Sequence, residues 1–132
     1  MLEPLAFKFR RSLKQAIKKQ GFEIRTNTQF ETLIRLCAST RENGEGTWIT
    51  EEMIQAYITL HRNGYAISFE TYREDELVGG LYGVKLGQVL FGESMVSLIP
   101  DASKAALASL CQESEQHQIQ LIDCQVPTSH LE

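Results

Sequence analysis

The chain has 132 residues, of which 42% are hydrophobic and 23% charged, a composition typical of one soluble globular domain with its own hydrophobic core. No apolar run is long enough to span a membrane, and the first residues lack the apolar core of a signal peptide. We therefore expect a cytoplasmic protein without a membrane partner. The three cysteines and three histidines show no ligand spacing, which argues against a structural metal site.

The net charge of −4 is distributed unevenly along the chain. Residues 1–25 hold seven basic and two acidic residues, whereas the remainder holds six basic and fifteen acidic ones. Within the basic segment, residues 9–20 predict an amphipathic helix, with Leu13, Ala16 and Ile17 on its apolar face. A basic helix on an acidic body suggests a localised contact with a polyanion, although a solvated helix face explains the same charges.

The segments that follow combine a strand with a helix. Residues 22–25 alternate and predict a short strand. Thr28 and Glu31 have the spacing of a capping box, which predicts a helix starting beside them. The composition of residues 39–46 predicts a loop.

A further helix is predicted from Thr50, which is followed by two acids suited to a first helical turn, to Asn63. Trp48 directly precedes this helix and is the only tryptophan of the chain. A large aromatic residue at such a junction more often fills a core than binds a ligand.

From residue 65 the apolar period changes to two, which predicts three antiparallel strands joined by tight turns. The strands span residues 65–72, 77–84 and 88–96, with turns at 74–75 and 86–87. Several glycines interrupt them. Glycines inside strands often mark bulges or sites where another backbone or a ligand comes close.

A helix over residues 102–115, with Asp101 as its cap, and a strand over residues 119–126 complete the prediction. A strand-helix-strand connection favours a right-handed crossover, which would place the 88–96 and 119–126 strands side by side and parallel. The element order therefore predicts a single α/β domain over residues 1–132, with a mixed sheet and flanking helices.

Two acids, Glu93 and Asp123, fall within otherwise apolar strands. Asp123 and Gln125 lie two residues apart and so share a strand face, where the carboxylate can hold the Gln amide with its carbonyl outward. Such an acceptor can align an attacking amine, and Glu93 can pair with a cation. This pattern favours the joining of an amine to an activated acyl group. Exposed strand ends or backbone donors are the simpler explanation for both acids.

Five blocks of the sequence resemble the leucyl/phenylalanyl-tRNA–protein transferase family in order and spacing. They are GTWITEEMIQAYITLH (46–61), ELVGGLYGV (76–84), GESM (92–95), DASKAAL (101–107) and LIDCQV (121–126). The resemblance implies a Gcn5-related N-acetyltransferase-like fold without its last strands. It implies transfer of Leu or Phe from aminoacyl-tRNA to the N-terminal Lys or Arg of proteins, which marks them for degradation. It implies no cofactor, since the Gly-rich pyrophosphate loop of acetyl-CoA relatives has no counterpart here.

The resemblance also assigns roles to residues. Asp123 and Gln125 match the pair that activates the attacking α-amine, and Glu93 matches the acid that receives the basic N-terminal residue. Trp48 and Tyr57 match aromatics around the terminal adenosine and aminoacyl group. The pocket for the apolar donor side chain is matched by Leu81, Met95, Leu107, Leu110 and Ile122. The basic helix that contacts the acceptor stem, in a salt-sensitive and sequence-independent way, is matched by Arg11, Lys14, Lys18 and Lys19.

The chain departs from the family pattern at Ile67, Tyr72 and Leu98, where the family usually has His, Trp and Arg. It also lacks counterparts of the family's N-terminal lobe and of its last segment. A second hypothesis is therefore a truncated, non-catalytic homologue that binds tRNA, peptide N-termini or itself, as a homodimer through the edge of its last strand. A third, an acetyltransferase, is opposed by the missing Gly-rich loop.

Overall fold

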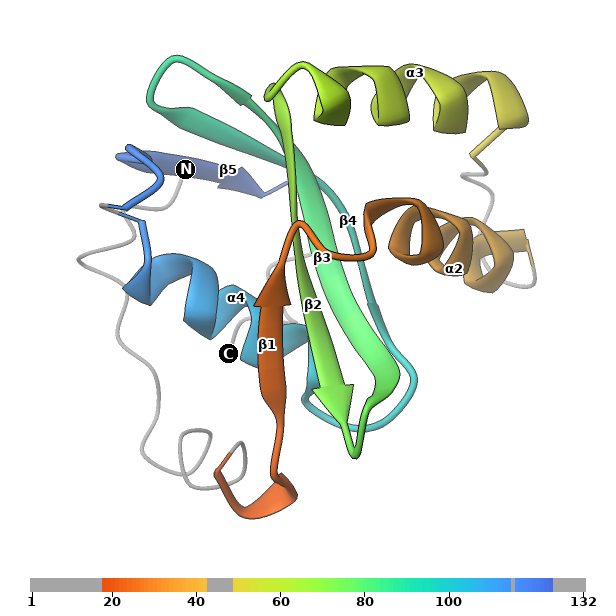
Figure 1. Cartoon of the computed structure of the whole chain (residues 1–132), viewed down its shortest axis with the longest axis vertical. Coiled ribbons are helices and arrows are strands. Elements are labelled where there is room, and N and C mark those ends of the chain that lie inside the picture. The colour runs from red at the N-terminus through yellow and green to blue at the C-terminus, as the bar shows by residue number, and fades with distance from the viewer. Residues whose placement is uncertain (1–17, 43–48, 115, 125–132) are drawn as a thin grey trace.

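The computed structural model describes residues 18–42, 49–114 and 116–124. Figure 1 shows a single twisted sheet with helices on both faces. The elements in chain order are β1 (Glu23–Thr26), α2 (Phe30–Glu42), α3 (Glu51–Arg62), β2 (Ala66–Arg73), β3 (Glu76–Leu86), β4 (Val89–Ser97), α4 (Ala102–Gln112) and β5 (Leu121–Cys124). None of the helices in these residues is long and apolar enough to cross a membrane.

The strands lie in the sheet in the same order as in the chain, β1-β2-β3-β4-β5. β2, β3 and β4 form an antiparallel meander, and β1 pairs antiparallel with β2. β5 is parallel to β4 because α4 carries the chain back across the sheet. The predicted mixed sheet and the parallel pairing of its last two strands are confirmed. The turn between β3 and β4 lies at residues 87–88, one residue later than predicted.

The helices divide the core into two layers. On one face, α2 and α3 enclose a cluster that includes Leu33, Ile34 and Tyr82. On the other face, α4 covers a cluster that includes Phe69 and Leu110. Burial of each such side chain contributes roughly 1.5–3 kcal/mol, so both faces of the sheet hold the fold together.

The start of α2 is fixed by a buried carboxylate and not by the predicted capping box. The Thr28 N–H and hydroxyl both donate to Glu70 Oε1, at 3.2 and 2.6 Å. Glu70 belongs to β2 and is fully buried, so it ties the entrance of α2 to the sheet. At its other end α2 continues to Glu42, into the segment predicted as a loop.

The caps of the two later helices differ in origin. Thr50 caps α3 as predicted, because its side chain accepts a hydrogen bond from Met53 N–H at 3.2 Å. Asp101 is the N-cap residue of α4, as predicted, but its side chain makes no capping hydrogen bond. Instead the Ser97 hydroxyl, at the end of β4, accepts from Ser103 N–H at 2.7 Å. A strand residue thus caps the helix that follows it.

Gly79 allows α4 to pack closely on the sheet. A Cβ at this position would lie 2.7 Å from Ala102 Cβ and 2.6 Å from the Val96 carbonyl oxygen. We expect Gly79→Ala to lower the free energy of unfolding by about 1–3 kcal/mol, the usual cost of overpacking, in urea denaturation. Ala102→Gly removes the helix side of this contact, so the double variant should recover part of the loss. Strictly additive effects would contradict this explanation.

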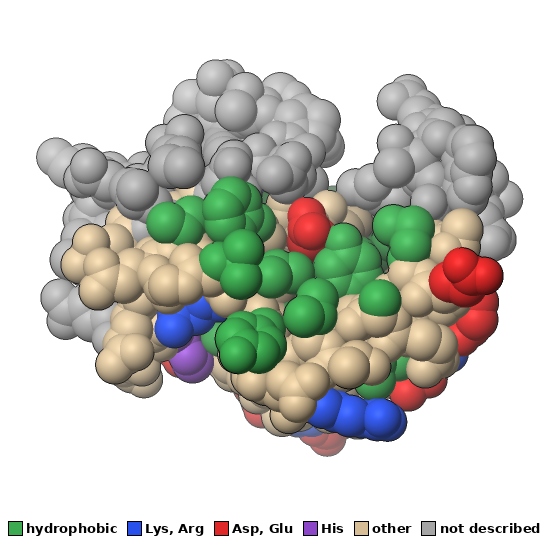
Figure 2. All heavy atoms as spheres, turned by 90° about the horizontal axis from the view of Figure 1, so that it is seen from above, with side chains coloured by type: hydrophobic (Ala, Val, Ile, Leu, Met, Phe, Trp, Pro, Cys, Tyr) green, Lys and Arg blue, Asp and Glu red, His purple; other side chains and the backbone are tan. Residues whose placement is uncertain are grey.

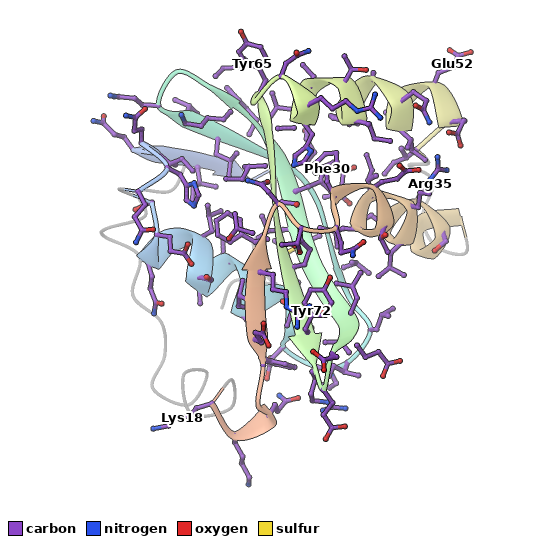
Figure 3. The ribbon with its side chains drawn as sticks, viewed as in Figure 1. Lys18, Phe30, Arg35, Glu52, Tyr65 and Tyr72 are labelled. Atoms are coloured by element: carbon purple, nitrogen blue, oxygen red, sulfur yellow. The ribbon has the colours of Figure 1, made fainter. Side chains whose placement is uncertain are left out.

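Arg35 joins α2 to α3 at the surface (Figure 3). Its guanidinium binds both oxygens of Glu51 at 2.9 Å and one oxygen of Glu31 at 3.0 Å. The hydrogen bonds from Arg35 are the main reason why the pKa of Glu51 falls from 4.5 to about 2. Because the pKa is lowered in the folded state, this interaction stabilises the fold above about pH 4.5 and is lost as the pH falls toward about 2.

We expect Arg35→Gln to destabilise the protein more at pH 7 than at pH 3, in urea denaturation at both values. The effect should be small and should shrink with added salt, because all three side chains are exposed. Arg73→Gln is the control, since Arg73 makes no ion pair with any residue in the described ranges. An equal effect of Arg35→Gln at both pH values would show that the ion pairs do not contribute.

Candidate active site

A bulge in β4 sets the position of Glu93. Gly92 and Ser94 pair with the successive β3 residues Gly83 and Tyr82, so the intervening Glu93 has no partner across the ladder. Bulges of this kind redirect a side chain and are frequent beside active sites. The expectation that a strand glycine marks a bulge is confirmed at Gly83.

The Glu93 carboxylate is held by Tyr57 of α3. The Tyr57 hydroxyl donates to Glu93 Oε1 at 2.9 Å. Partial burial, with smaller effects of the hydrogen bond and the charge of Glu93, raises the pKa of Tyr57 to about 12. The phenol therefore remains a protonated donor at neutral pH. Glu93 Oε2 has no hydrogen-bond partner in the part of the chain that the structure describes, so it can pair with an incoming cation.

Glu93 lies in a groove of about 490 Å³ between α3 and the β3–β4 hairpin. The other residues of this groove are Met53, Ala56, Tyr57, Leu60, Val84, Leu86 and Phe91. Figure 2, which looks at the molecule from the α3 side, shows hydrophobic side chains gathered around one acidic side chain. Leu86 is 57% exposed, so the groove is open to solvent. Apolar walls with one carboxylate suit an aliphatic chain that ends in a cation.

A second, smaller cavity of about 20 Å³ lies on the α4 face of the sheet. The five residues predicted to line the pocket for the donor side chain all surround it: Leu81, Met95, Leu107, Leu110 and Ile122. They come from β3, β4, α4 and β5, and Leu90, Gly92 and Ser94 complete the lining. This volume is about that of a single water-sized probe, so a Leu or Phe side chain could enter only if these residues moved apart.

The structure describes the predicted catalytic pair, Asp123 and Gln125, only in part. The backbone of Asp123 lies in β5 beside Phe91 of β4, but its side chain lies outside the description, as does the whole of Gln125. The described register ends at the pair Gly92–Cys124. These are the sequence neighbours of Glu93 and Gln125.

Of the remaining predicted site residues, Trp48, Arg11 and Lys14 lie outside the described residues. Lys18 and Lys19 are exposed, and Figure 3 shows Lys18 at the end of the molecule opposite α3. The described residues contain no group of three or more His, Cys, Asp or Glu side chains that could hold a metal ion.

Apart from Tyr57, sequence reasoning missed the walls of the Glu93 groove. Phe91 lies two residues before Glu93 in β4, so strand alternation alone could have placed both on one face. No comparable sequence signal joins Met53 or Leu86 to this site, because helix α3 and the hairpin meet only through the tertiary fold.

Structural comparison defines the class of fold. An aminoglycoside acetyltransferase from an uncultured soil metagenomic sample, in complex with trehalose, aligns with a TM-score of 0.61 and 16% identity over 86% of this chain and 82% of its own. A ribosomal-protein-alanine N-acetyltransferase from Brucella melitensis biovar Abortus 2308 aligns with a TM-score of 0.57 and 13% identity, over 83% of this chain and 85% of its own. The fold is therefore that of the N-acetyltransferases, as predicted.

Sequence comparison defines the family. The family model described as leucyl/phenylalanyl-tRNA protein transferase matches residues 1–132. Proteins of that name are 50% identical over 131 residues in Nitrosomonas eutropha and 49% identical over 127 residues in Hydrogenovibrio crunogenus. The chain belongs to this family, which confirms the resemblance. The two alignments include 99% and 96% of this chain but only 56% and 50% of the relatives. The chain therefore spans about half the length of these relatives.

Proposed function

We propose that this chain is the core of an aminoacyltransferase, which moves Leu or Phe from aminoacyl-tRNA to the N-terminal Lys or Arg of proteins in the cytoplasm and so tags them for degradation. The observation that carries this proposal is Glu93, held on one oxygen by Tyr57 in an apolar groove open to solvent. The names of the relatives support the same reaction.

The groove accounts for the choice of acceptor. The methylenes of a Lys or Arg side chain lie against apolar walls such as Phe91 and Leu86, while the cationic end pairs with Glu93 Oε2. A hydrogen bond between charged groups contributes about 1.5–3 kcal/mol. A neutral side chain in the same position leaves the carboxylate desolvated without a partner, which is unfavourable.

The donor and the chemistry involve the residues around β5. The five apolar residues of the small cavity, once it opens, receive the Leu or Phe side chain, whose full burial contributes roughly 1.5–3 kcal/mol. Asp123 orients Gln125, whose carbonyl aligns the α-amine. The amine nitrogen attacks the ester carbonyl, an amide bond forms, and the ester C–O bond breaks. The tRNA leaves as a free hydroxyl that takes up the proton lost by the amine.

Further residues contact the tRNA, and one of them, Tyr57, also lines the Glu93 groove. Trp48 and Tyr57 surround the terminal adenosine and aminoacyl group, with the aromatic rings as stacking surfaces. The acceptor stem lies on four basic residues near the N-terminus, Arg11, Lys14, Lys18 and Lys19. Contacts to phosphates are salt-sensitive and carry little sequence information.

The N-terminus of α4 does not fit the pyrophosphate of acetyl-CoA. A phosphate at a helix N-terminus needs unpaired N–H groups. Here the Ser103 N–H already donates to the Ser97 hydroxyl, and the Asp101 carboxylate belongs to the same turn. The segment between β4 and α4 contains no glycine. These features disfavour the acetyltransferase hypothesis.

The β5 edge favours a second candidate function, a non-catalytic homologue. β5 is the last strand of the sheet among the described residues, and an open edge can pair with another chain. This candidate binds tRNA, peptide N-termini or a second copy of itself without transferring an amino acid. Light scattering tests the homodimer: a monomeric mass at high protein concentration would contradict pairing through this edge.

Incubation with Leu-tRNA and a peptide that begins with Arg tests the first candidate. We expect Leu to be transferred to the peptide, and Asp123→Ala to abolish the transfer. Asp75→Asn removes a carboxylate from the β2–β3 turn and should leave transfer unchanged. Binding of tRNA without transfer by the unaltered chain would favour the non-catalytic homologue instead.

A further inference from the structure

A polar hollow of about 390 Å³ lies at the start of β2 and shares no lining residue with the Glu93 groove. Its lining comes from four segments: Asn27, His61, Gly64, Ala66, Ile67, Lys85 and His117. The hollow lies beyond the end of β1. The last backbone hydrogen bond between β1 and β2 is the one that the Asn27 N–H donates to the Ser68 carbonyl oxygen. Figure 3 marks this end of β2 with the label of Tyr65, next to the end of α3.

The side chain of Asn27 has a fixed orientation in this hollow. Its Oδ1 accepts the Ser68 N–H at 2.9 Å and lies 3.3 Å from His61 Nε2. Because Oδ1 can only accept, Nε2 carries the proton. Burial lowers the pKa of His61 below 6.5, opposed by the charge of Glu70, so the ring is neutral at pH 7. Asn27 Nδ2 has no acceptor among the described residues and remains available as a donor.

The edge of β2 supplies a backbone donor. In an antiparallel strand the N–H groups of alternate residues point the same way. The Ser68 N–H points toward Asn27, so the Ala66 N–H points to the same side, beyond the end of β1. No strand covers Ala66 there in the part of the chain that the structure describes.

Two side chains on the opposite wall complete the hollow. Lys85 is partly buried, and its ammonium group makes no ion pair with any residue in the described ranges. His117 Nε2 is buried without a hydrogen-bond partner in those ranges and lies 3.7 Å from Glu113 Oε1. None of the described lining residues carries a carboxylate, so the permanent charge that they contribute is positive.

We propose that this hollow binds a small oxyanion, a phosphate or carboxylate group, through the Lys85 ammonium, the Asn27 amide and the Ala66 N–H. Three donors of different kinds, with no competing acid among the lining residues that the structure describes, match a ligand that offers only acceptors. The two acids that interact with the histidines of the lining are already engaged: Glu70 by Thr28 and Ser68, and Glu113 by the Ser109 hydroxyl. The site does not depend on the aminoacyl transfer proposed above.

A titration of the ¹⁵N-labelled chain with inorganic phosphate, followed by NMR at constant ionic strength, tests this site. We expect saturable shifts of the Ala66 and Lys85 amides and of the Asn27 side-chain amide. Lys85→Gln should weaken binding at least tenfold, whereas Lys85→Arg should retain it. Arg73→Gln makes the same charge change at the other end of β2 and should have no effect. Absence of saturation, or equal weakening by Lys85→Gln and Arg73→Gln, would overturn the proposal.

Further titrations identify the source of the oxyanion. Acetate in place of phosphate tests a carboxylate, and a short RNA duplex tests a phosphodiester. If either probe shifts the same amides and Lys85→Gln abolishes these shifts, the site is supported and the probe identifies its ligand class. The same shifts with a tetramethylammonium salt of chloride, at matched concentration, would show that the hollow does not select oxyanions and would overturn the proposal.

Discussion

Glu93→Gln should lower kcat/KM for transfer to a peptide with N-terminal Arg by about ten- to a hundredfold, mainly through a higher KM. Glutamine has nearly the same shape and its carbonyl can still accept the Tyr57 hydroxyl, so the groove keeps its form. What is lost is the charge opposite the guanidinium. A charge-assisted hydrogen bond contributes about 1.5–3 kcal/mol, and about 1.4 kcal/mol corresponds to a factor of ten. Steady-state kinetics with varied peptide measures the effect.

Two controls separate this role from a merely structural one. Tyr57→Phe removes the hydrogen bond but keeps the carboxylate, so it should cost less than Glu93→Gln. A peptide with N-terminal Met has no cationic side chain to pair with Glu93, so the transfer of Leu to it should be much slower. The rate of that transfer should be the same in Glu93→Gln as in the unaltered chain. If both peptides lost activity equally, Glu93 would not be the group that recognises the acceptor's charge.

Glu70→Ala should lower the free energy of unfolding by about 2–4 kcal/mol, since the loss of a buried acceptor leaves its donors unpaired. The carboxylate is fully buried and accepts from the Thr28 N–H, the Thr28 hydroxyl and the Ser68 hydroxyl. Removing it leaves these groups without an acceptor at the junction of β1, α2 and β2. Urea denaturation followed by circular dichroism gives the difference.

Glu70→Gln is the matched variant. Its amide oxygen can accept both Thr28 donors, so it should cost less than Glu70→Ala. Because the charge of Glu70 raises the pKa of His61 against the effect of burial, its removal should lower that pKa further. NMR titration of the His61 ring measures this shift. An unchanged His61 pKa in Glu70→Gln would contradict this electrostatic effect of Glu70 on His61.

The sequence predicted the elements of this fold well and their connections to one another less well. Apolar periods of two and of 3.6 are local properties, so the β2–β4 meander, the helices and the crossover to β5 could be read along the chain. The helix starts could be read only in part. Thr50 caps α3 from its own segment, whereas Thr28 donates to Glu70, a residue 42 positions away. A capping box competes with any buried acceptor that folding brings near it.

The candidate site likewise has residues that the sequence indicates and residues that only the tertiary fold brings together. The acids Glu93 and Asp123 stand out in the sequence because charges are rare within apolar strands, and the five apolar residues around the small cavity follow from the resemblance. The groove beside Glu93 could not be predicted from either of these signals. Tyr57 and Glu93 are 36 positions apart, and no local pattern shows that α3 packs beside this part of β4.

By itself, then, the sequence determined the type and order of the elements, the family, and the residues that carry charge in apolar surroundings. Only the tertiary structure decided which of them meet: Tyr57 with Glu93, Thr28 with Glu70, and Lys85 with Asn27 around one hollow. The physical reason is that periodicity acts between neighbours in the chain. Hydrogen bonds and ion pairs act between neighbours in space, which the packing of the two core layers selects.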